Sequence, residues 1–287
     1  MRAVAVDWTG DVRPAHNLAV AEASNGVLAS LALVSSREVA VDQLCRRASD
    51  EILVGLDFAL SFPAWFVRSL GVASAPELWD VVSEQGECWL SQCPPPFWGR
   101  RGRRRPEGLV GFRECESAFP PVGGARPKSV FQIGGAGTVG TGSVRGMPFL
   151  RRLKAAGYAI WPFDEPRLPL VVEIWPRALT GQVVKSDPAR RADYLGRFGD
   201  DAGAFVRLAT ANEHAFDAAV SAMCLSRLDA EVDALRRGEG DELLEGAIFP
   251  PALPPAPSGR ALSPTLSRDG HGPSSAACGP PHRSAGR

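Results

Sequence analysis

Three apolar, strand-like segments of the sequence each carry a single carboxylate. The segments read VAVDW, LVGLDF and VVEIW, and their acids are Asp7, Asp57 and Glu173. Burying a carboxylate without a partner is costly, so a strand that only fills a core would carry another aliphatic residue there. Taken alone, each acid is explained at least as well by an arginine partner or by the capping of a neighbouring helix.

A fourth acid interrupts the apolar side of a predicted helix. Steps of three, seven and eleven residues from Asp217 reach Val220, Cys224 and Leu228, which follow one stripe of an α-helix. Asp217 therefore lies on the apolar stripe and not on the solvated face. His214 shares its side of the helix, either to shuttle protons or simply to hydrogen-bond.

Four isolated acids on four apolar elements lead us to expect that the acids converge. Carboxylates repel one another unless cations neutralise them, and Mg²⁺ prefers oxygen ligands. Two divalent ions about 4 Å apart activate a water and stabilise a leaving oxygen in phosphodiester hydrolysis. The sequence thus predicts one or two Mg²⁺ or Mn²⁺ ions held by Asp7, Asp57 and Asp217, with Glu173 and His214 as further catalytic groups.

The stretch at residues 131–142, FQIGGAGTVGTG, contains the spacing of a dinucleotide-binding fingerprint. That fingerprint needs a strand before the glycines and a helix directly after them. Here Gly140 is followed by TGSVRGMP, and a helix is expected to resume only near Pro148. We therefore expect no dinucleotide site. The stretch is instead interpreted as a loop whose backbone N–H groups contact a phosphate, or as a plain glycine-rich surface turn.

Further donors and cations are candidates to bind a phosphate backbone near the acids. The segment GRRGRRR at residues 99–105 follows Phe97 and Trp98, and it either grips nucleic acid or is a solvated run of charge. Arg113, Glu114 and Glu116 are a minor candidate group to face the site. The predicted substrate-binding residues are Thr9, Gly10, Lys128, Ser129, Gly137, Thr138, Arg145 and Arg177.

Periodicity and turn signals predict the elements that carry these residues. Strands are expected at 2–8, 18–24, 27–35, 52–63, 158–163 and 168–176, and helices at 38–49, 146–157, 187–199 and 209–238, the last as one helix or a pair. Residues from about 73 to 147 are expected to form an insertion of loops and short helices, because proline and glycine are dense there. Residues 1–249 are expected to be the folded domain, and the proline-rich residues 250–287 a disordered tail.

Composition limits the partners and the compartment. The chain has 32 basic and 32 acidic residues, so any attraction to nucleic acid must come from a local patch. No secretory signal and no membrane-spanning run is recognised. We therefore expect a cytoplasmic protein with reduced cysteines, with nucleic acid, DNA or RNA, as its partner and with its oligomeric state left open.

The order of these features resembles the ribonuclease-H-like fold, and more closely the domain-of-unknown-function 429 family of predicted ribonuclease-H-like nucleases. The resemblance implies an α/β fold with a mixed five-stranded sheet flanked by helices, and it implicates Asp7, Asp57 and Asp217 at the metal site. Glu173 matches less well, and Asp57 stands where many relatives of the superfamily carry Glu. The matching stretches, spread over residues 1 to about 225, are VAVDWTG, GLDFALSFP, SVFQIGGAGTVGTGSVRGMPFL, WPFD, VEIWPRAL and EHAFDAAVSA.

The expected function is metal-dependent phosphodiester hydrolysis. One alternative is a non-catalytic nucleic-acid-binding or protein-binding module on the same fold. Another is an ATP-dependent phosphotransferase like actin or the sugar kinases, with DWTGD as its phosphate hairpin, although no second core of that kind follows residue 180. A Ser-His-Asp hydrolase is disfavoured, because the only other histidine before the tail is His16.

Overall fold

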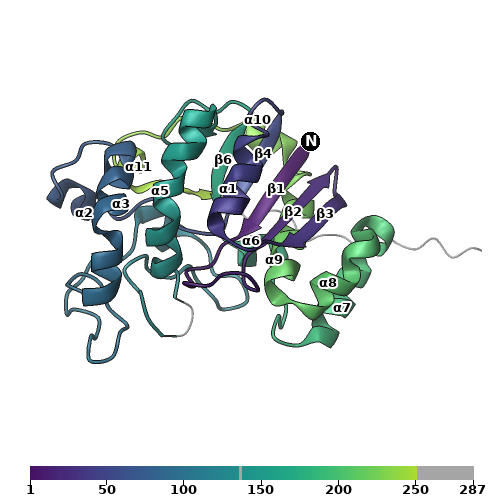
Figure 1. Cartoon of the computed structure of the whole chain (residues 1–287), viewed down its shortest axis with the longest axis horizontal. Coiled ribbons are helices and arrows are strands. Elements are labelled where there is room, and N and C mark those ends of the chain that lie inside the picture. The colour runs from purple at the N-terminus through teal and green to yellow at the C-terminus, as the bar shows by residue number, and fades with distance from the viewer. Residues whose placement is uncertain (136–137, 251–287) are drawn as a thin grey trace, which may run out of the picture.

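The computed structural model describes residues 1–135 and 138–250. Within them the chain forms an α/β structure with a mixed sheet of seven strands, shown in Figure 1. The expected α/β class and the mixed sheet are confirmed. Gly137 and the expected tail beyond Pro250 lie outside the described residues.

The sheet combines an antiparallel hairpin with a parallel half. Its order is β3-β2-β1-β4-β6-β5, and β7 also pairs with β6. The β1–β2 and β2–β3 pairs are antiparallel, and the other pairs are parallel. The resemblance implied five strands and the periodicities predicted six, and the seventh is the two-residue strand β7, which was not predicted. The strands are β1 (Arg2–Asp7), β2 (Ala19–Ser24), β3 (Val27–Leu33), β4 (Ile52–Leu56), β5 (Ala159–Ile160), β6 (Leu170–Ile174) and β7 (Ile248–Phe249).

Alternate strand residues pack into two separate cores, one on each face of the sheet. On β1, Val4 and Val6 belong to the core beneath α1, α3 and α5, whereas Ala3 and Ala5 belong to the core beneath α8 and α9. The alanines leave room for an alanine-rich helix, α9, to pack closely on the strands. The helices are α1 (Arg37–Cys45), α2 (Ala64–Ser69), α3 (Ala75–Gln92), α4 (Glu114–Ala118), α5 (Gly140–Ala156), α6 (Pro176–Thr180), α7 (Pro188–Leu195), α8 (Val206–Ala211), α9 (Glu213–Leu225), α10 (Asp229–Asp233) and α11 (Glu242–Glu245), with a 3-10 segment at Gly196–Phe205.

The insertion contributes more to the core than its composition indicated. The prediction of loops and short helices is wrong for α3, an 18-residue helix that buries Trp79 and Trp89. Its apolar residues recur at helical spacing from Ala75 onwards, and Ser74 caps its first turn by accepting a hydrogen bond from the N–H of Glu77. The density of proline and glycine on either side obscured this amphipathic helix.

The glycine-rich stretch leads directly into a helix, contrary to expectation. Helix α5 begins at Gly140, and Pro148 lies inside it. A Cβ atom at Gly140 would lie 2.2 Å from the carbonyl oxygen of Val130, so this glycine permits close packing of the helix start. A strand of the sheet before the glycines is still missing, because Gln132 forms only an isolated bridge with Trp98. The dinucleotide fingerprint therefore remains incomplete.

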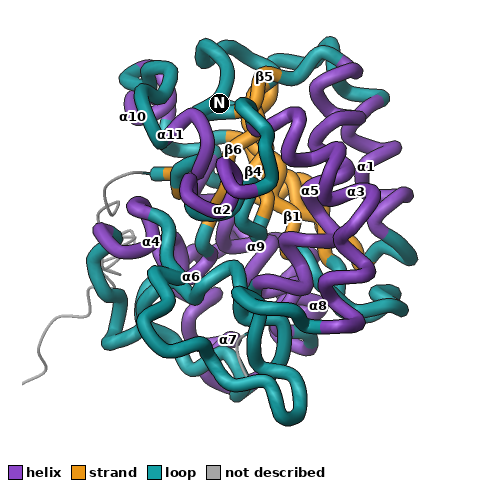
Figure 2. The backbone as a smooth tube through the Cα atoms, turned by 90° about the vertical axis from the view of Figure 1, so that its left-hand side faces the viewer, coloured by secondary structure: helices purple, strands orange, loops and turns teal. Residues whose placement is uncertain are grey.

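Several expected elements are shorter in the structure. The fourth strand ends at Leu56 rather than at Pro63, and the strand expected at 158–163 covers only Ala159–Ile160. The helix expected at 209–238 is divided among α8, α9 and α10. Loops gather at the end of the sheet where β1 finishes (Figure 2), and the site lies at this end.

Candidate functional site

Two of the predicted acids leave the sheet side by side. Strands β1 and β4 run parallel, and their register pairs Val6 with Leu56. Asp7 ends β1, and Asp57 follows β4 and donates its N–H to the carbonyl oxygen of Val6 at 3.1 Å. A Cβ atom at Gly55 would touch Leu225 of α9, so strand alternation turns Asp57 toward α9 as well. The carboxyl ends of two parallel strands thus place both acids on one face.

Helix α9 brings the third acid to the same place. Asn212 caps the helix by accepting a hydrogen bond from the N–H of Ala215. His214 and Asp217, one turn apart, face the sheet from its first turns. The Nδ1 atom of His214 lies 2.8 Å from Oδ1 of Asp7. The convergence expected of Asp7, Asp57 and Asp217 therefore occurs across the contact between sheet and helix.

A lysine that the sequence did not single out lies among the three acids. Lys185, from the segment between α6 and α7, donates a hydrogen bond to Oδ2 of Asp217, and its charge also acts on Asp7 and Asp57. The buried guanidinium of Arg191 in α7 bonds to the backbone carbonyl of Lys185 and to that of Thr210. This loop is thereby held so that an ammonium group faces the acids.

The acids repel one another in surroundings that disfavour charge. Burial raises the pKa of Asp57 well above its usual range, and the charges of Asp7 and Asp217 raise it further. Burial also raises the pKa of Asp7, although the hydrogen bond from His214 opposes this. The same hydrogen bond raises the pKa of His214. Such a group of carboxylates is stabilised by an added cation.

Asp217 is the most informative member of this group. It is only 8% exposed, and its Oδ1 atom is buried with no hydrogen-bond partner in the described part of the chain. Burial raises its pKa to about 7, and Lys185 opposes the shift. Buried polar atoms are nearly always satisfied. Carboxylate oxygens are the ligand type that a hard divalent ion prefers.

The arrangement is nevertheless not a closed metal site. Across residues 1–135 and 138–250, no group of three or more His, Cys, Asp or Glu side chains could hold a metal ion as placed. Lys185 bonds one oxygen of Asp217 and supplies a positive charge there. A divalent ion would have to displace this ammonium.

Glu173 lies on the other face of the sheet from the three acids. Its register partner is Leu56, which belongs to the core beneath α5. Arg113 donates to both of its oxygens, at 2.7 and 2.5 Å, and the N–H of Leu60 donates at 3.0 Å. An arginine partner was the alternative explanation for a buried acid on this strand, and Glu173 has one. The geometry therefore does not support the catalytic assistance expected of Glu173.

Arg113 anchors the insertion to the sheet through this contact. It is 1% exposed and also bonds Glu116. Burial alone would lower the pKa of Arg113, but the neighbouring negative charges hold it well above its usual range. The minor candidate group of the insertion thus faces the site through Arg113 and Glu116, as structural support for Glu173.

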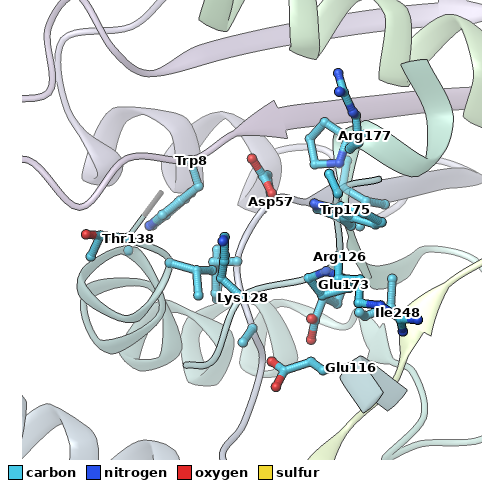
Figure 3. A pocket seen from close by; sticks show the side chains of 18 of the residues that line it. Trp8, Asp57, Glu116, Arg126, Lys128, Thr138, Glu173, Trp175, Arg177 and Ile248 are labelled. Carbon is cyan, nitrogen blue, oxygen red and sulfur yellow. The ribbon is translucent and has the colours of Figure 1, made fainter. Parts of the chain in front are cut away.

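A cavity of about 400 Å³ opens beside Asp57, within the range of small-ligand pockets. Figure 3 shows it, with Trp8 and Trp175 on opposite sides of Asp57. Cationic side chains outnumber anionic ones in its lining, so the cavity attracts anions. Its anionic residues are Asp57, Glu116 and Glu173, and its cationic residues are Arg113, Arg126, Lys128, Arg177 and Lys185.

The predicted substrate-binding residues divide between the cavity wall and the scaffold. Gly10, Lys128, Thr138 and Arg177 line the cavity, although the guanidinium of Arg177 bonds to the carbonyl oxygen of Val183 and points away from Glu116 (Figure 3). These four residues therefore lie where a substrate-binding residue was expected.

The remaining three described candidates have structural contacts. The hydroxyl of Thr9 accepts a hydrogen bond from the N–H of Asp11. Buried Ser129 donates to the carbonyl oxygen of Gly111. Arg145 bonds to Glu87 and to the carbonyl oxygen of Gly10. Their expected role in substrate binding is not supported, because local partners engage their polar groups. Thr9 and Arg145 instead shape the loop after Asp7.

The rarity of lysine in the sequence is the signal that would have singled out Lys185. The chain has only three lysines, at positions 128, 154 and 185, and its other basic residues are arginines. Two of the three, Lys128 and Lys185, line the cavity. A sequence that uses arginine almost everywhere therefore places a compact ammonium group where the acids converge.

Comparisons with protein-family models, with curated proteins and with solved structures find no match for this chain. The geometry of the site is therefore the basis for inferring its function. Among the described helices, none has both the length and the apolar character that crossing a membrane requires.

The raised pKa of Asp217 predicts a specific dependence of stability on pH. Folding raises this pKa from 3.8 to about 7, so the acid favours the folded state fully below pH 4 and loses that contribution as pH rises through 7. In EDTA, the unfolding free energy of Asp217→Asn relative to that of wild type should increase by about 2–4 kcal/mol as the pH is raised from 4 to 8. Urea unfolding at each pH measures this, and a constant difference would contradict it.

Proposed function

We propose that this protein is a metal-dependent phosphodiester hydrolase of the ribonuclease-H-like type. The convergence of Asp7, Asp57 and Asp217, with one buried oxygen of Asp217 unsatisfied, is the observation that carries the proposal. The sheet order, in which an antiparallel hairpin precedes the parallel strands β1, β4 and β6, supports this architecture. The resemblance to the domain-of-unknown-function 429 family supports the same assignment.

Each side chain has a distinct part in the proposed reaction. Asp7, Asp57 and Asp217 would hold one or two Mg²⁺ or Mn²⁺ ions, which supply activation of the attacking water and stabilisation of the leaving oxygen. His214 orients Asp7 through the contact between Nδ1 and Oδ1, and this contact raises the pKa of His214. Lys185 offsets part of the negative charge of the acids until they bind a metal ion.

The cations of the cavity favour a substrate that carries phosphates. Arg126 and Lys128 are exposed and line the cavity beside Asp57. Long-range attraction and direct pairing of such side chains with phosphate oxygens dominate the affinity of nucleic-acid-binding proteins. Five cysteines of the described chain are free thiols, which is compatible with the cytoplasmic location that we propose.

Metal-dependent thermal stability tests the central claim. A ligand that binds only the folded state stabilises it by RT ln(1 + [L]/Kd), so millimolar Mn²⁺ or Mg²⁺ should raise the melting temperature of the wild type. In Asp7→Asn, which removes one repelling charge, we expect equal or higher stability in EDTA and no response to metal. Differential scanning calorimetry with and without metal measures both effects.

Asp164→Asn is the matched control for this experiment. Asp164 also pairs with a lysine, Lys154, at 2.5 Å, but it does not line the cavity. This variant should retain the full response to Mn²⁺. If the wild type shows no metal response and Asp7→Asn merely loses stability, the hydrolase proposal fails. A metal-positive result justifies cleavage assays on labelled single-stranded and duplex DNA and RNA, with Asp57→Asn as the inactive reference.

A non-catalytic nucleic-acid-binding module is the second candidate. The ion pair of Lys185 with Asp217 favours it, because one of the three acids already has a cationic partner without metal. This candidate predicts oligonucleotide binding of equal affinity in EDTA and in Mn²⁺. Fluorescence anisotropy with a labelled oligonucleotide distinguishes the two proposals.

A further inference from the structure

Helix α5 directs an N-terminus without a side-chain cap at the cavity. The helix has 17 residues, its N-cap residue Val139 provides no side-chain hydrogen bond, and its first turn contains no acid. Thr138, Val139 and Gly142 line the cavity. The N-terminus of a helix carries partial positive charge and free N–H groups that attract anions. The N–H of Gly140 already donates to the carbonyl oxygen of Gln132 at 3.0 Å, so the positive pole beside the acids is formed by the N–H groups of Thr141 and Gly142.

A buried donor without a partner lies at the same place. Trp8 is only 6% exposed, and its Nε1 atom has no hydrogen-bond partner among residues 1–135 and 138–250. A Cβ atom at Gly142 would lie 3.8 Å from Cδ1 of Trp8, the carbon bonded to Nε1, so the edge of the indole that carries the N–H faces the first turn of α5. Buried donors of this kind are normally satisfied, which points to a ligand acceptor in the cavity.

A free cation completes the set of donors. Lys128 is exposed and lines the cavity, and it forms no ion pair with any described residue. Figure 3 places Trp8, Thr138 and Lys128 on one side of Asp57, and Trp175, Glu173 and Ile248 on the other. In this view the three donors therefore lie on the same side of Asp57.

The first turn of α5 also contacts the segments that follow two of the acids. A Cβ atom at Gly10 would lie 2.6 Å from the backbone nitrogen of Gly142, and Gly10 follows Asp7 by three residues. The N–H of Ala59, two residues after Asp57, donates to Oγ of Ser143 at 3.0 Å. An anion bound at this helix end would lie next to the ends of β1 and β4.

We propose that the N-terminus of α5, Nε1 of Trp8 and the ammonium of Lys128 form a phosphate-binding subsite. It holds a phosphate group of the substrate that flanks the one being hydrolysed. That role rests on the proposed hydrolase function, whereas binding of free phosphate does not.

Line broadening of the ³¹P NMR signal of inorganic phosphate tests the subsite directly. The experiment uses the full chain in EDTA at constant ionic strength, so that no metal takes part. We expect the wild type to broaden the phosphate signal. In Trp8→Phe the broadening should fall about fivefold, because one neutral hydrogen bond to phosphate is lost. Lys128→Gln should reduce it at least as much, because the lost contact is charged.

Trp98→Phe is the matched control. The Nε1 atom of Trp98 is also buried and has no partner among the residues that the structure describes, but Trp98 does not line the cavity. This variant should therefore broaden the signal as wild type does. Absence of broadening with wild type, or equal broadening in Trp8→Phe and Lys128→Gln, would overturn the subsite. If Trp8→Phe does not fold, the exposed Lys128→Gln decides the question.

The two proposals fail in different ways. Phosphate binding in EDTA without any thermal response to Mn²⁺ would remove the hydrolase proposal and keep the subsite. A thermal response to Mn²⁺ without phosphate broadening would remove the subsite and keep the metal site.

Discussion

Replacing Arg113 by methionine is expected to lower the free energy of unfolding by about 3–5 kcal/mol. The guanidinium is almost fully buried and neutralises two buried carboxylates, Glu173 and Glu116. Methionine has a similar length but no charge, so both acids would be left without their cation. The contact also joins α4 to β6 across 60 residues of sequence, and its loss should loosen the insertion. Urea unfolding at pH 7.5 measures the change.

Two further variants separate the structural role of this contact from a metal-binding one. Arg151→Met removes an exposed ion pair with Asp80 and should cost less than about 1 kcal/mol. Glu173→Gln should lower stability but leave the thermal response to Mn²⁺ unchanged, because Glu173 faces away from the three acids. A metal response that disappears in Glu173→Gln would restore the catalytic assistance first expected of that residue.

Replacing Lys185 by methionine is expected to make the fold depend on metal. Without the ammonium, Asp217 loses its hydrogen-bonded partner, and Asp7 and Asp57 lose a neutralising charge. At pH 8 in EDTA, the unfolding free energy should fall by about 1–3 kcal/mol, less than for Arg113 because Lys185 is partly exposed. Millimolar Mn²⁺ should restore this loss, and its affinity should rise about tenfold because no lysine competes.

Lys154→Met is the matched control for this variant. Lys154 pairs with Asp164 at similar exposure, 34% against 27% for Lys185, so its replacement removes a comparable ion pair away from the acids. Its stability loss should not be restored by Mn²⁺. If Lys185→Met is destabilised and Mn²⁺ has no effect on it, Lys185 is a structural ion-pair partner and the binding-module alternative gains support. Calorimetric titration gives the affinities.

Local chemistry determined a large part of this protein from its sequence. A run of apolar residues interrupted by one acid identified β1, β4 and β6 and their carboxylates, because an unpaired buried charge is too costly to occur by chance in a strand. The 3.6-residue period placed Asp217 on the buried side of α9, and the structure confirms it. The α/β class and the mixed sheet follow from the same periodicities.

Only the tertiary structure decided which acids act together. Strand alternation has a period of two, so Asp7 and Asp57 share a face whereas Glu173, at the level of Leu56, lies on the other. Its partner Arg113 comes from a distant segment whose proline and glycine content resembles a surface loop. The position of Lys185 likewise depends on how Arg191 holds the segment between α6 and α7. Sequence periodicity reports burial within one element, but pairing between elements depends on register and packing across the whole chain.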